Sequence, residues 1–141
     1  MPSSAELVCV DPKRVREIWP HIAPLLRKAT LRTRLSAFAD IECDILDGRA
    51  LLWIAVSGKR GRLAIEAVAS TSLQQTDRGK VCVITACAGT HMSRWLPLIA
   101  GIENYAKDED CICVRIFGRK GWLRALEGYR AKYIISEKEL R

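Results

Sequence analysis

The sequence has no apolar run long enough to cross a membrane. Its longest apolar segments, residues 50–57 and 81–89, are far shorter than the roughly 18 residues that a spanning helix needs. Residues 1–11 place no basic stretch ahead of an apolar block, so no secretory signal is expected. Internal repeats and low-complexity tracts are also absent. We therefore expect a globular protein of the cytoplasm with no membrane partner.

Strong charge segregation is also missing. The 141 residues are 49% hydrophobic and 28% charged, which is typical of a single globular domain spanning residues 1–141. The formal charge of +7 is shared by both halves of the chain, so no basic tail stands out. Residues 115–132 concentrate some of it, with six Lys and Arg side chains against Glu127 alone. Nucleic-acid binding through this basic C-terminal surface is permitted by the charge but not indicated by a motif.

The cysteines do not follow a metal-binding pattern. Zinc sites favour closely spaced cysteines in turns with histidine or further cysteine nearby. Here two pairs lie in apolar segments, where a reduced cysteine packs as a small hydrophobic residue. Cys82 and Cys87 should face opposite sides of one strand because their spacing is odd. We predict no metal site. The six cysteines are Cys9, Cys43, Cys82, Cys87, Cys111 and Cys113.

Two helices are predicted in the first third of the chain. Asp11 and Pro12 form a favourable helix start, an N-cap acceptor followed by proline. Apolar residues then recur at helical spacing, although Pro20 and Pro24 are expected to kink or divide the helix. A second helix is predicted over residues 35–46. The apolar stripe of the first helix consists of Val15, Ile18, Trp19, Ile22 and Leu26.

The rest of the chain reads as strands with two further helices. Apolar segments predict a hairpin followed by a third strand. This third strand, the next helix and a fourth strand are predicted to form a βαβ crossover, and a short helix then leads into a last strand. The fold class is α+β, with element order ααβββαβαβ, a mixed sheet and helices on both faces. In chain order the predicted elements after the second helix cover 50–56, 63–69, 80–88, 93–107, 111–117, 121–127 and 131–136.

The loop at residues 89–95 is the first candidate site. It connects a buried strand to the start of a helix, where unpaired amides and the helix dipole favour an anion, and Arg94 adds positive charge. The loop has a single glycine and matches neither the P-loop nor the dinucleotide fingerprint. His91 in the same loop is a candidate general base, although a lone histidine is more often a surface or packing residue.

The order of elements resembles the GNAT acyltransferase superfamily, most clearly from the strand at residues 81–88 to the Gly128-Tyr129 step. The segment 111–140 also resembles small phage and prophage proteins of this fold. The resemblance covers about residues 6–141. It implies an acyl-CoA site in which the amides of Ala86, Cys87 and Ala88 pair with pantetheine. Thr90, Ser93 and Arg94 would then hold the pyrophosphate.

The resemblance also implies catalytic roles. Glu66, in the middle of the sheet, would deprotonate an amine; the alternative is that its side chain only faces solvent. Arg124 occupies the position, four residues before the Gly-Tyr step, where the family often has a proton-donating tyrosine. Arginine stays protonated, so it would act by electrostatic stabilisation or phosphate binding, or would simply be a solvated side chain.

Two functions remain open from the sequence. The first is a transfer of an acyl group from acetyl-CoA or another acyl-CoA to an unknown amine, with His91, Glu66 and Arg124 as the catalytic candidates. The second is a non-catalytic, phage-type accessory protein on the same fold, whose basic C-terminal surface binds an acidic macromolecular partner. Exposed strand edges would allow a homodimer in either case.

Overall fold

The computed structural model describes residues 5–33, 36–59, 62–90, 96–116 and 124–141. Described helices and strands follow one another in chain order as β1 (Glu6–Cys9), α1 (Val15–Thr33), α2 (Phe38–Leu46), β2 (Leu51–Lys59), β3 (Arg62–Thr76), β4 (Gly79–Gly89), the 3₁₀ turn η1 (Leu96–Leu98), α4 (Ile99–Asp108) and β5 (Cys113–Ile116). None of the described helices combines the length and apolar character required to cross a membrane.

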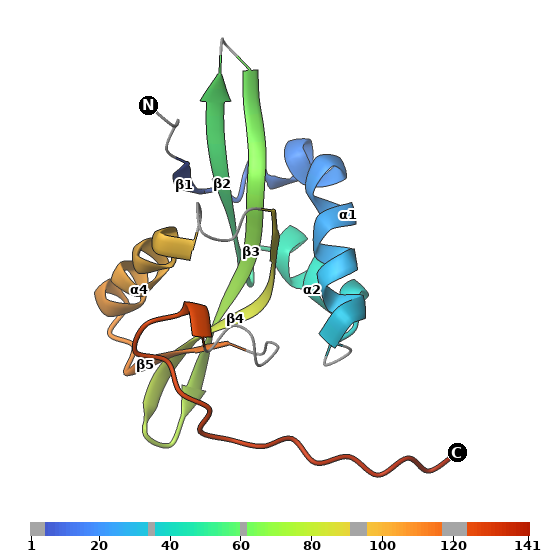
Figure 1. The fold of residues 1–141 in the computed structure, drawn as a ribbon, viewed down its shortest axis with the longest axis vertical. Helices are drawn as coiled ribbons and strands as arrows, with labels where there is room; N and C mark the ends of the chain where they lie inside the picture. Colours follow the sequence, from blue (N-terminus) through green and yellow to red (C-terminus); the bar gives the residue numbers. More distant parts are fainter. Residues whose placement is uncertain (1–4, 34–35, 60–61, 91–95, 117–123) are drawn as a thin grey trace.

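The described strands form one mixed sheet with the order β1–β2–β3–β4–β5. Neighbouring strands are antiparallel except for β4 and β5, which are parallel and are connected through α4. Helices α1 and α2 cover one face of the sheet, and α4 covers the other (Figure 1). The predicted fold class, an α+β domain with a mixed sheet and a βαβ crossover, is confirmed.

The two ends of the sheet differ from the predicted order. Strand β1 was not predicted, and it pairs with β2 in the register Glu6 to Val56 through Cys9 to Trp53. The strand predicted at residues 131–136 is wrong, because this segment has no regular structure and runs away from the sheet (Figure 1). A short strand forms only where a neighbour accepts its hydrogen bonds. Of the short helix predicted at 121–127, the described part is helical at residues 124–125.

Helix α1 is continuous, so Pro20 and Pro24, which were expected to kink or divide it, do not divide it. Both prolines lie inside the 19-residue helix, four residues apart and exposed to solvent. Each removes one amide from the hydrogen-bond ladder, but on the outer face the carbonyl that loses its partner can be hydrated. The opposite face follows the predicted stripe, and its Val15, Trp19, Ile22 and Leu26 are buried.

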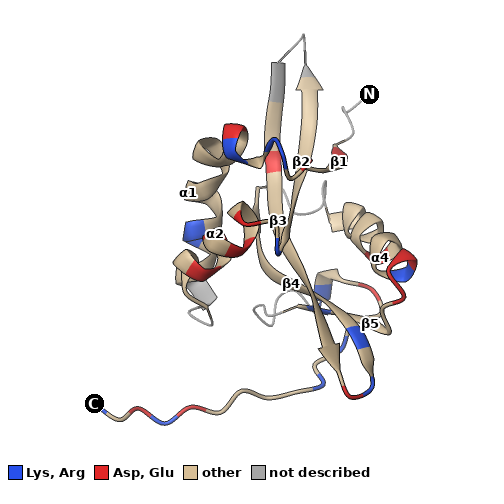
Figure 2. Ribbon diagram, turned by 180° about the vertical axis from the view of Figure 1, so that it is seen from behind, with Lys and Arg blue, Asp and Glu red and all other residues tan. Residues whose placement is uncertain are grey.

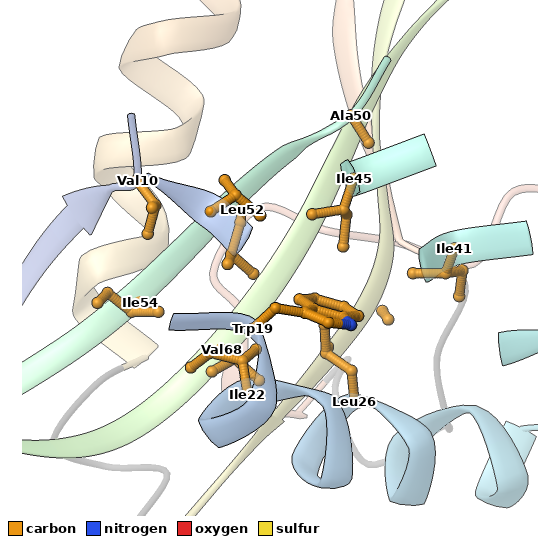
Figure 3. Packing of buried hydrophobic residues seen from close by; sticks show 12 residues of the cluster. Val10, Trp19, Ile22, Leu26, Ile41, Ile45, Ala50, Leu52, Ile54 and Val68 are labelled. Atoms are coloured by element: carbon orange, nitrogen blue, oxygen red, sulfur yellow. The ribbon is translucent and has the colours of Figure 1, made fainter. Parts of the chain in front are cut away.

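A hydrophobic cluster fills the space between α1, α2 and the sheet (Figure 3). Ile22 and Leu26 of α1 are fully buried, as are Ile45 of α2 and Leu52 of β2. Trp19 closes the cluster at the helix–helix contact, where its ring lies 6.2 Å from that of Phe38. Because the indole nitrogen donates a 2.7 Å hydrogen bond to Glu42 Oε2, this large side chain packs without leaving its polar atom unpaired.

A second cluster lies on the α4 face. Ile99 and Ile102 of α4 pack over Ile84 of β4, and Trp53 of β2 donates a buried 2.9 Å hydrogen bond to Thr71 Oγ1. Gly101 allows a close approach between α4 and β1, because a Cβ at this position would lie 2.6 Å from Leu7 Cδ2. The central strands of the sheet are therefore covered on both faces, in line with the continuous apolar pattern of residues 80–88.

Candidate functional site

Strand β4 contains a bulge at Thr85. Ile84 pairs with Thr71 and Ala86 pairs with Ser70, so Thr85 is an extra residue opposite none. Its hydroxyl donates a 3.2 Å hydrogen bond to the backbone oxygen of Ser70. Such bulges bend a strand, change the direction of its side chains, and often lie beside active sites. This bulge was not predicted, because a single threonine in an apolar strand is a weak signal for it.

The bulge reverses the alternation of side chains along β4. Cys82 and Ile84 before the bulge and Cys87 after it all pack in the cluster on the α4 face, whereas Ala86 and Ala88 pack on the α1 face. The expectation that Cys82 and Cys87 face opposite sides is therefore wrong. One inserted residue restores both cysteines to the same face.

The described pairing between β4 and β5 ends at Ile84, immediately before the bulge. Strand β5 pairs with Val81 to Ile84 only, and within the described residues Thr85 to Gly89 have no strand on that side. Backbone groups in a strand point alternately to its two edges. Along residues 86–88, every second residue therefore directs its N–H and C=O away from β3, toward the edge that has no described neighbour. These residues are either Cys87 alone or both Ala86 and Ala88. The three residues predicted to pair with pantetheine lie together on this segment.

Glu66 is also at a bulge, in the neighbouring strand β3. Ile65 pairs with Val56 and Ala67 pairs with Ala55, which leaves Glu66 as the extra residue. Its side chain is buried, with 9% of its surface exposed, so the alternative of a solvent-facing carboxylate is wrong. The backbone oxygen of Glu66 accepts a 3.0 Å hydrogen bond from the amide of Thr90. The fold thus joins Glu66 to the start of the predicted phosphate loop.

For the remaining predicted site residues, no described contact connects them to this region. Arg124 is exposed and lies in the short helical turn at residues 124–125. His91, Ser93 and Arg94 lie outside the described residues. The structure thus places Glu66, Thr90 and the residues of the β4 edge on neighbouring strands. The roles of all the predicted site residues stay predictions.

The Gly128-Tyr129 step connects the C-terminal segment to α4. Gly128 adopts a left-handed backbone with φ of +82°, which glycine tolerates without strain. Tyr129 then donates a 2.7 Å hydrogen bond to Glu103 Oε2 of α4. Burial, together with this hydrogen bond, raises the pKa of Tyr129 above its ordinary value. The step is present as predicted, although no described strand follows it.

All six cysteines are free thiols. Cys82 is buried and Cys87 is partly buried, and loss of solvation raises the pKa of Cys82 to about 11 and that of Cys87 to about 12. Both thiols are therefore protonated at neutral pH and are poor nucleophiles. Cys113 is exposed, contrary to the expected packing. Within the described ranges, no three His, Cys, Asp or Glu side chains group in a way that could hold a metal ion.

Comparison with known proteins was made by sequence and by structure. No family model matches the sequence, and no curated protein matches it. Solved structures do match over nearly the whole chain. A predicted acetyltransferase from Clostridium acetobutylicum, solved with acetyl-CoA, superimposes with a TM-score of 0.62 at 14% identity, covering 96% of each chain.

Two further structures extend the likeness. A GNAT family acetyltransferase from Staphylococcus aureus has a TM-score of 0.65 at 11% identity, covering 97% of this chain and 99% of its own. An aminoglycoside acetyltransferase from an uncultured soil metagenomic sample, in complex with sisomicin, has a TM-score of 0.68 at 8% identity, covering 97% of each chain. At these identities the likeness concerns the fold. This chain has the fold of the GNAT acetyltransferases.

Proposed function

We propose that the protein is an acyl-CoA-dependent N-acyltransferase that acts on an amine. The observation that carries the proposal is the edge of β4 after Thr85, which has no described neighbour and lies in a fold shared with a protein solved with acetyl-CoA. The acyl group is acetyl or another small acyl group. Membership of the GNAT family, beyond the shared fold, is part of the same proposal.

The residues at the β4 edge fit the cofactor. Pantetheine contains amide groups, and the backbone of Ala86 to Ala88 would offer both a donor and an acceptor at an edge that has no described neighbour, as in the addition of a strand to a sheet. Thr90, Ser93 and Arg94 would hold the pyrophosphate at the loop that precedes η1 and α4. When bound, the cofactor supplies an acyl thioester, which is activated toward attack by an amine.

Glu66 supplies the base in this proposal. The amine nitrogen attacks the thioester carbonyl carbon, so that a C–N bond forms and the C–S bond breaks. Glu66 accepts the proton that the amine loses, directly or through water, and the departing sulfur takes up a proton from the site. The main contribution of the protein is to hold the amine and the thioester in contact, since positioning alone can supply much of the rate enhancement.

Calorimetric titration of the full chain with acetyl-CoA tests the first step. We expect saturable binding in the micromolar range that weakens on Arg94→Ala and is unchanged on Arg78→Ala, a matched removal of charge in the exposed β3–β4 turn. The absence of binding at millimolar acetyl-CoA would refute the proposed function.

The role of Glu66 is tested separately. Glu66→Gln should leave acetyl-CoA binding intact and lower the acylation rate by roughly 10²- to 10⁴-fold, the range that general base catalysis contributes. An unchanged rate would exclude Glu66 as the base.

The non-catalytic alternative stays a prediction that no finding favours. Part of the basic C-terminal surface is engaged within the protein, because the cationic groups of Arg115 and Lys132 lie 5.4 and 5.8 Å from the centre of the Tyr133 ring. The resemblance to phage proteins and the homodimer likewise stay predictions. Binding to nucleic acid that falls steeply with salt would favour the alternative.

A further inference from the structure

Within the described residues, the sheet ends at β5, whose outer edge has no neighbour. Strand β5 is the last strand in the sheet order and pairs with β4 alone, along Val81–Ile84. The side chains of β5 are exposed or half-buried, whereas those of Val81–Ile84 beside them are buried. An edge without a neighbour offers a row of N–H and C=O groups to which another strand can pair.

The C-terminal tail, residues 134–141, combines the sequence of a strand with exposure to solvent. A strand is predicted over residues 131–136, but the chain there has no regular structure. Ile134, Ile135 and Leu140 are 91%, 60% and 88% exposed. In Figure 1 and in Figure 2 the tail extends beyond the outline of the domain. Large apolar side chains that gather on an exposed segment indicate a surface that another molecule covers.

The chain is held close to β5 just before the tail begins. Tyr129 is hydrogen-bonded to Glu103 of α4, and the guanidinium carbon of Arg115 in β5 lies 5.4 Å from the centre of the Tyr133 ring. Beyond Tyr133 the tail points away, so it leaves the edge of its own β5 uncovered (Figure 1). Its eight residues span up to about 28 Å when extended, which exceeds the length of the four-residue strand β5.

The two faces of the tail suit the two faces of β5. Val114 and Ile116 of β5 pack with the cluster on the α4 face, so Arg115 between them points to the opposite face. In an extended tail, Ile134 and Glu137 also lie on opposite faces because their spacing is odd. A tail strand beside β5 can therefore add Ile134 to the apolar cluster and bring Glu137 to the face that carries Arg115.

We infer that the protein forms a two-fold dimer by exchange of its C-terminal tails, in which the tail of each copy pairs with β5 of the other. Strand addition of this kind uses main-chain hydrogen bonds for affinity and alternate side chains for specificity. Each copy gives one tail and receives one, so both edges are covered and the assembly closes at two copies. The inference is independent of the proposed catalytic function.

Sedimentation equilibrium of the full chain from micromolar to millimolar concentration tests the dimer. Ile134→Asp should raise the dissociation constant at least about 100-fold, because burial of one isoleucine strengthens a contact about tenfold or more and the dimer contains two exchanged strands. Leu31→Asp makes the same change at a position of α1 that is 67% exposed, and it should have no effect. Circular dichroism checks that both variants fold.

Three outcomes of this measurement would overturn the inference. The first is a full chain that stays monomeric at every concentration. The second is an equal effect of Ile134→Asp and Leu31→Asp, which would show a general response to charge. The third is a dimer that persists when residues 134–141 are removed, because its interface would then lie elsewhere.

Disulfide cross-linking distinguishes exchange between copies from pairing within one copy. Cys113 of β5 is an exposed thiol on the face that Ile135 shares in the proposed pairing. With the exposed Cys9 and Cys43 replaced by serine, Ile135→Cys should form a disulfide on mild oxidation that doubles the mass on a non-reducing gel. Ile134→Cys faces the other side and should not. A disulfide within one chain, or equal cross-linking of both variants, would contradict the exchange.

Discussion

The two faces of the sheet are built differently. On the α4 face, apolar side chains fill the space almost completely, and the gap lined by Trp53, Ile99 and Ile102 holds only about 20 Å³. On the opposite face the core lies under α1, and beside α2 it gives way to a polar pocket of about 300 Å³ whose lining includes Asp40 and Ser70. Among the described residues, the α4 face is therefore almost filled by apolar side chains, whereas the opposite face combines a core with a polar cavity.

Strand β4 contributes side chains to the clusters on both faces of the sheet. Before Thr85 it is paired on both edges, and after Thr85 it is paired only with β3 within the described residues. In our proposal the cofactor edge begins at this bulge. Substitutions on the two faces test the difference in packing between them.

The largest effect on stability should come from a substitution on the α4 face. Ile102→Ala removes a side chain that is 1% exposed and should lower the free energy of unfolding by about 2–5 kcal/mol, because the neighbouring groups cannot close the cavity. Asn104→Ala, at an exposed position of α4, is the control and should have little effect. Urea denaturation measures both. A loss below about 1 kcal/mol for Ile102→Ala would mean that this face is loosely packed.

Alkaline pH should destabilise the α4 face next. Burial raises the pKa of Cys82 from 9.0 to about 11, and that of Tyr105 from 10.0 to about 12. Between pH 9 and 11 the unfolded state loses the Cys82 proton while the folded state keeps it, so stability falls as the pH rises. The contribution of Cys82 is on the order of 2 kcal/mol. It should vanish in Cys82→Ala and persist in Cys43→Ala, an exposed thiol.

Urea denaturation at pH 8 and pH 10.5 provides the comparison. The fall in stability between the two pH values should be smaller for Cys82→Ala than for the parent chain. An identical fall in all three proteins would contradict the assignment of the effect to Cys82.

Reciprocal substitutions at adjacent residues of β3 compare the two faces directly. Ala69→Ser buries a hydroxyl on the α4 face and should lower the free energy of unfolding by about 1–3 kcal/mol. Ser70→Ala removes a hydroxyl that has no described partner, and it should leave the free energy of unfolding unchanged or raise it by about 1 kcal/mol. Thermal unfolding without ligand measures the difference. If Ser70→Ala were the more destabilising of the two, the pocket would be part of the structural core.

The smallest effect should come from the C-terminal tail of the monomer. Ile134, Ile135 and Leu140 are exposed, and removal of residues 134–141 should change the free energy of unfolding of the monomer by less than about 0.5 kcal/mol. Tyr133, which contacts Arg115, is retained. A loss above about 2 kcal/mol, at a protein concentration that keeps the full chain monomeric, would indicate that the tail pairs as a strand within its own copy.

The sequence predicted those elements whose signal is local. The stripe from Val15 to Leu26 and the βαβ unit around α4 both follow from the spacing of apolar residues. Strand β1 has only four residues and depends on pairing with β2, which is distant in sequence. The segment at 131–136 has strand propensity but no described partner. In both cases pairing with other parts of the chain overrides propensity.

The candidate site was predicted less completely than the fold. Resemblance pointed to Glu66 and to Ala86–Ala88, but alternation could not predict that a bulge lies at each segment, because a bulge is a mismatch between two strands. The pocket was missed because Asp40 and Ser70 come from elements that only the folded chain brings together. The run Ser70-Thr71-Ser72 after an apolar strand was the available signal.

Peptide-resolved hydrogen exchange with and without acetyl-CoA tests the central claim most directly. If the cofactor pairs with the edge of β4 after Thr85, acetyl-CoA should slow amide exchange in residues 85–90 and leave α2 unchanged. Unchanged exchange in residues 85–90 at saturating acetyl-CoA would contradict the account.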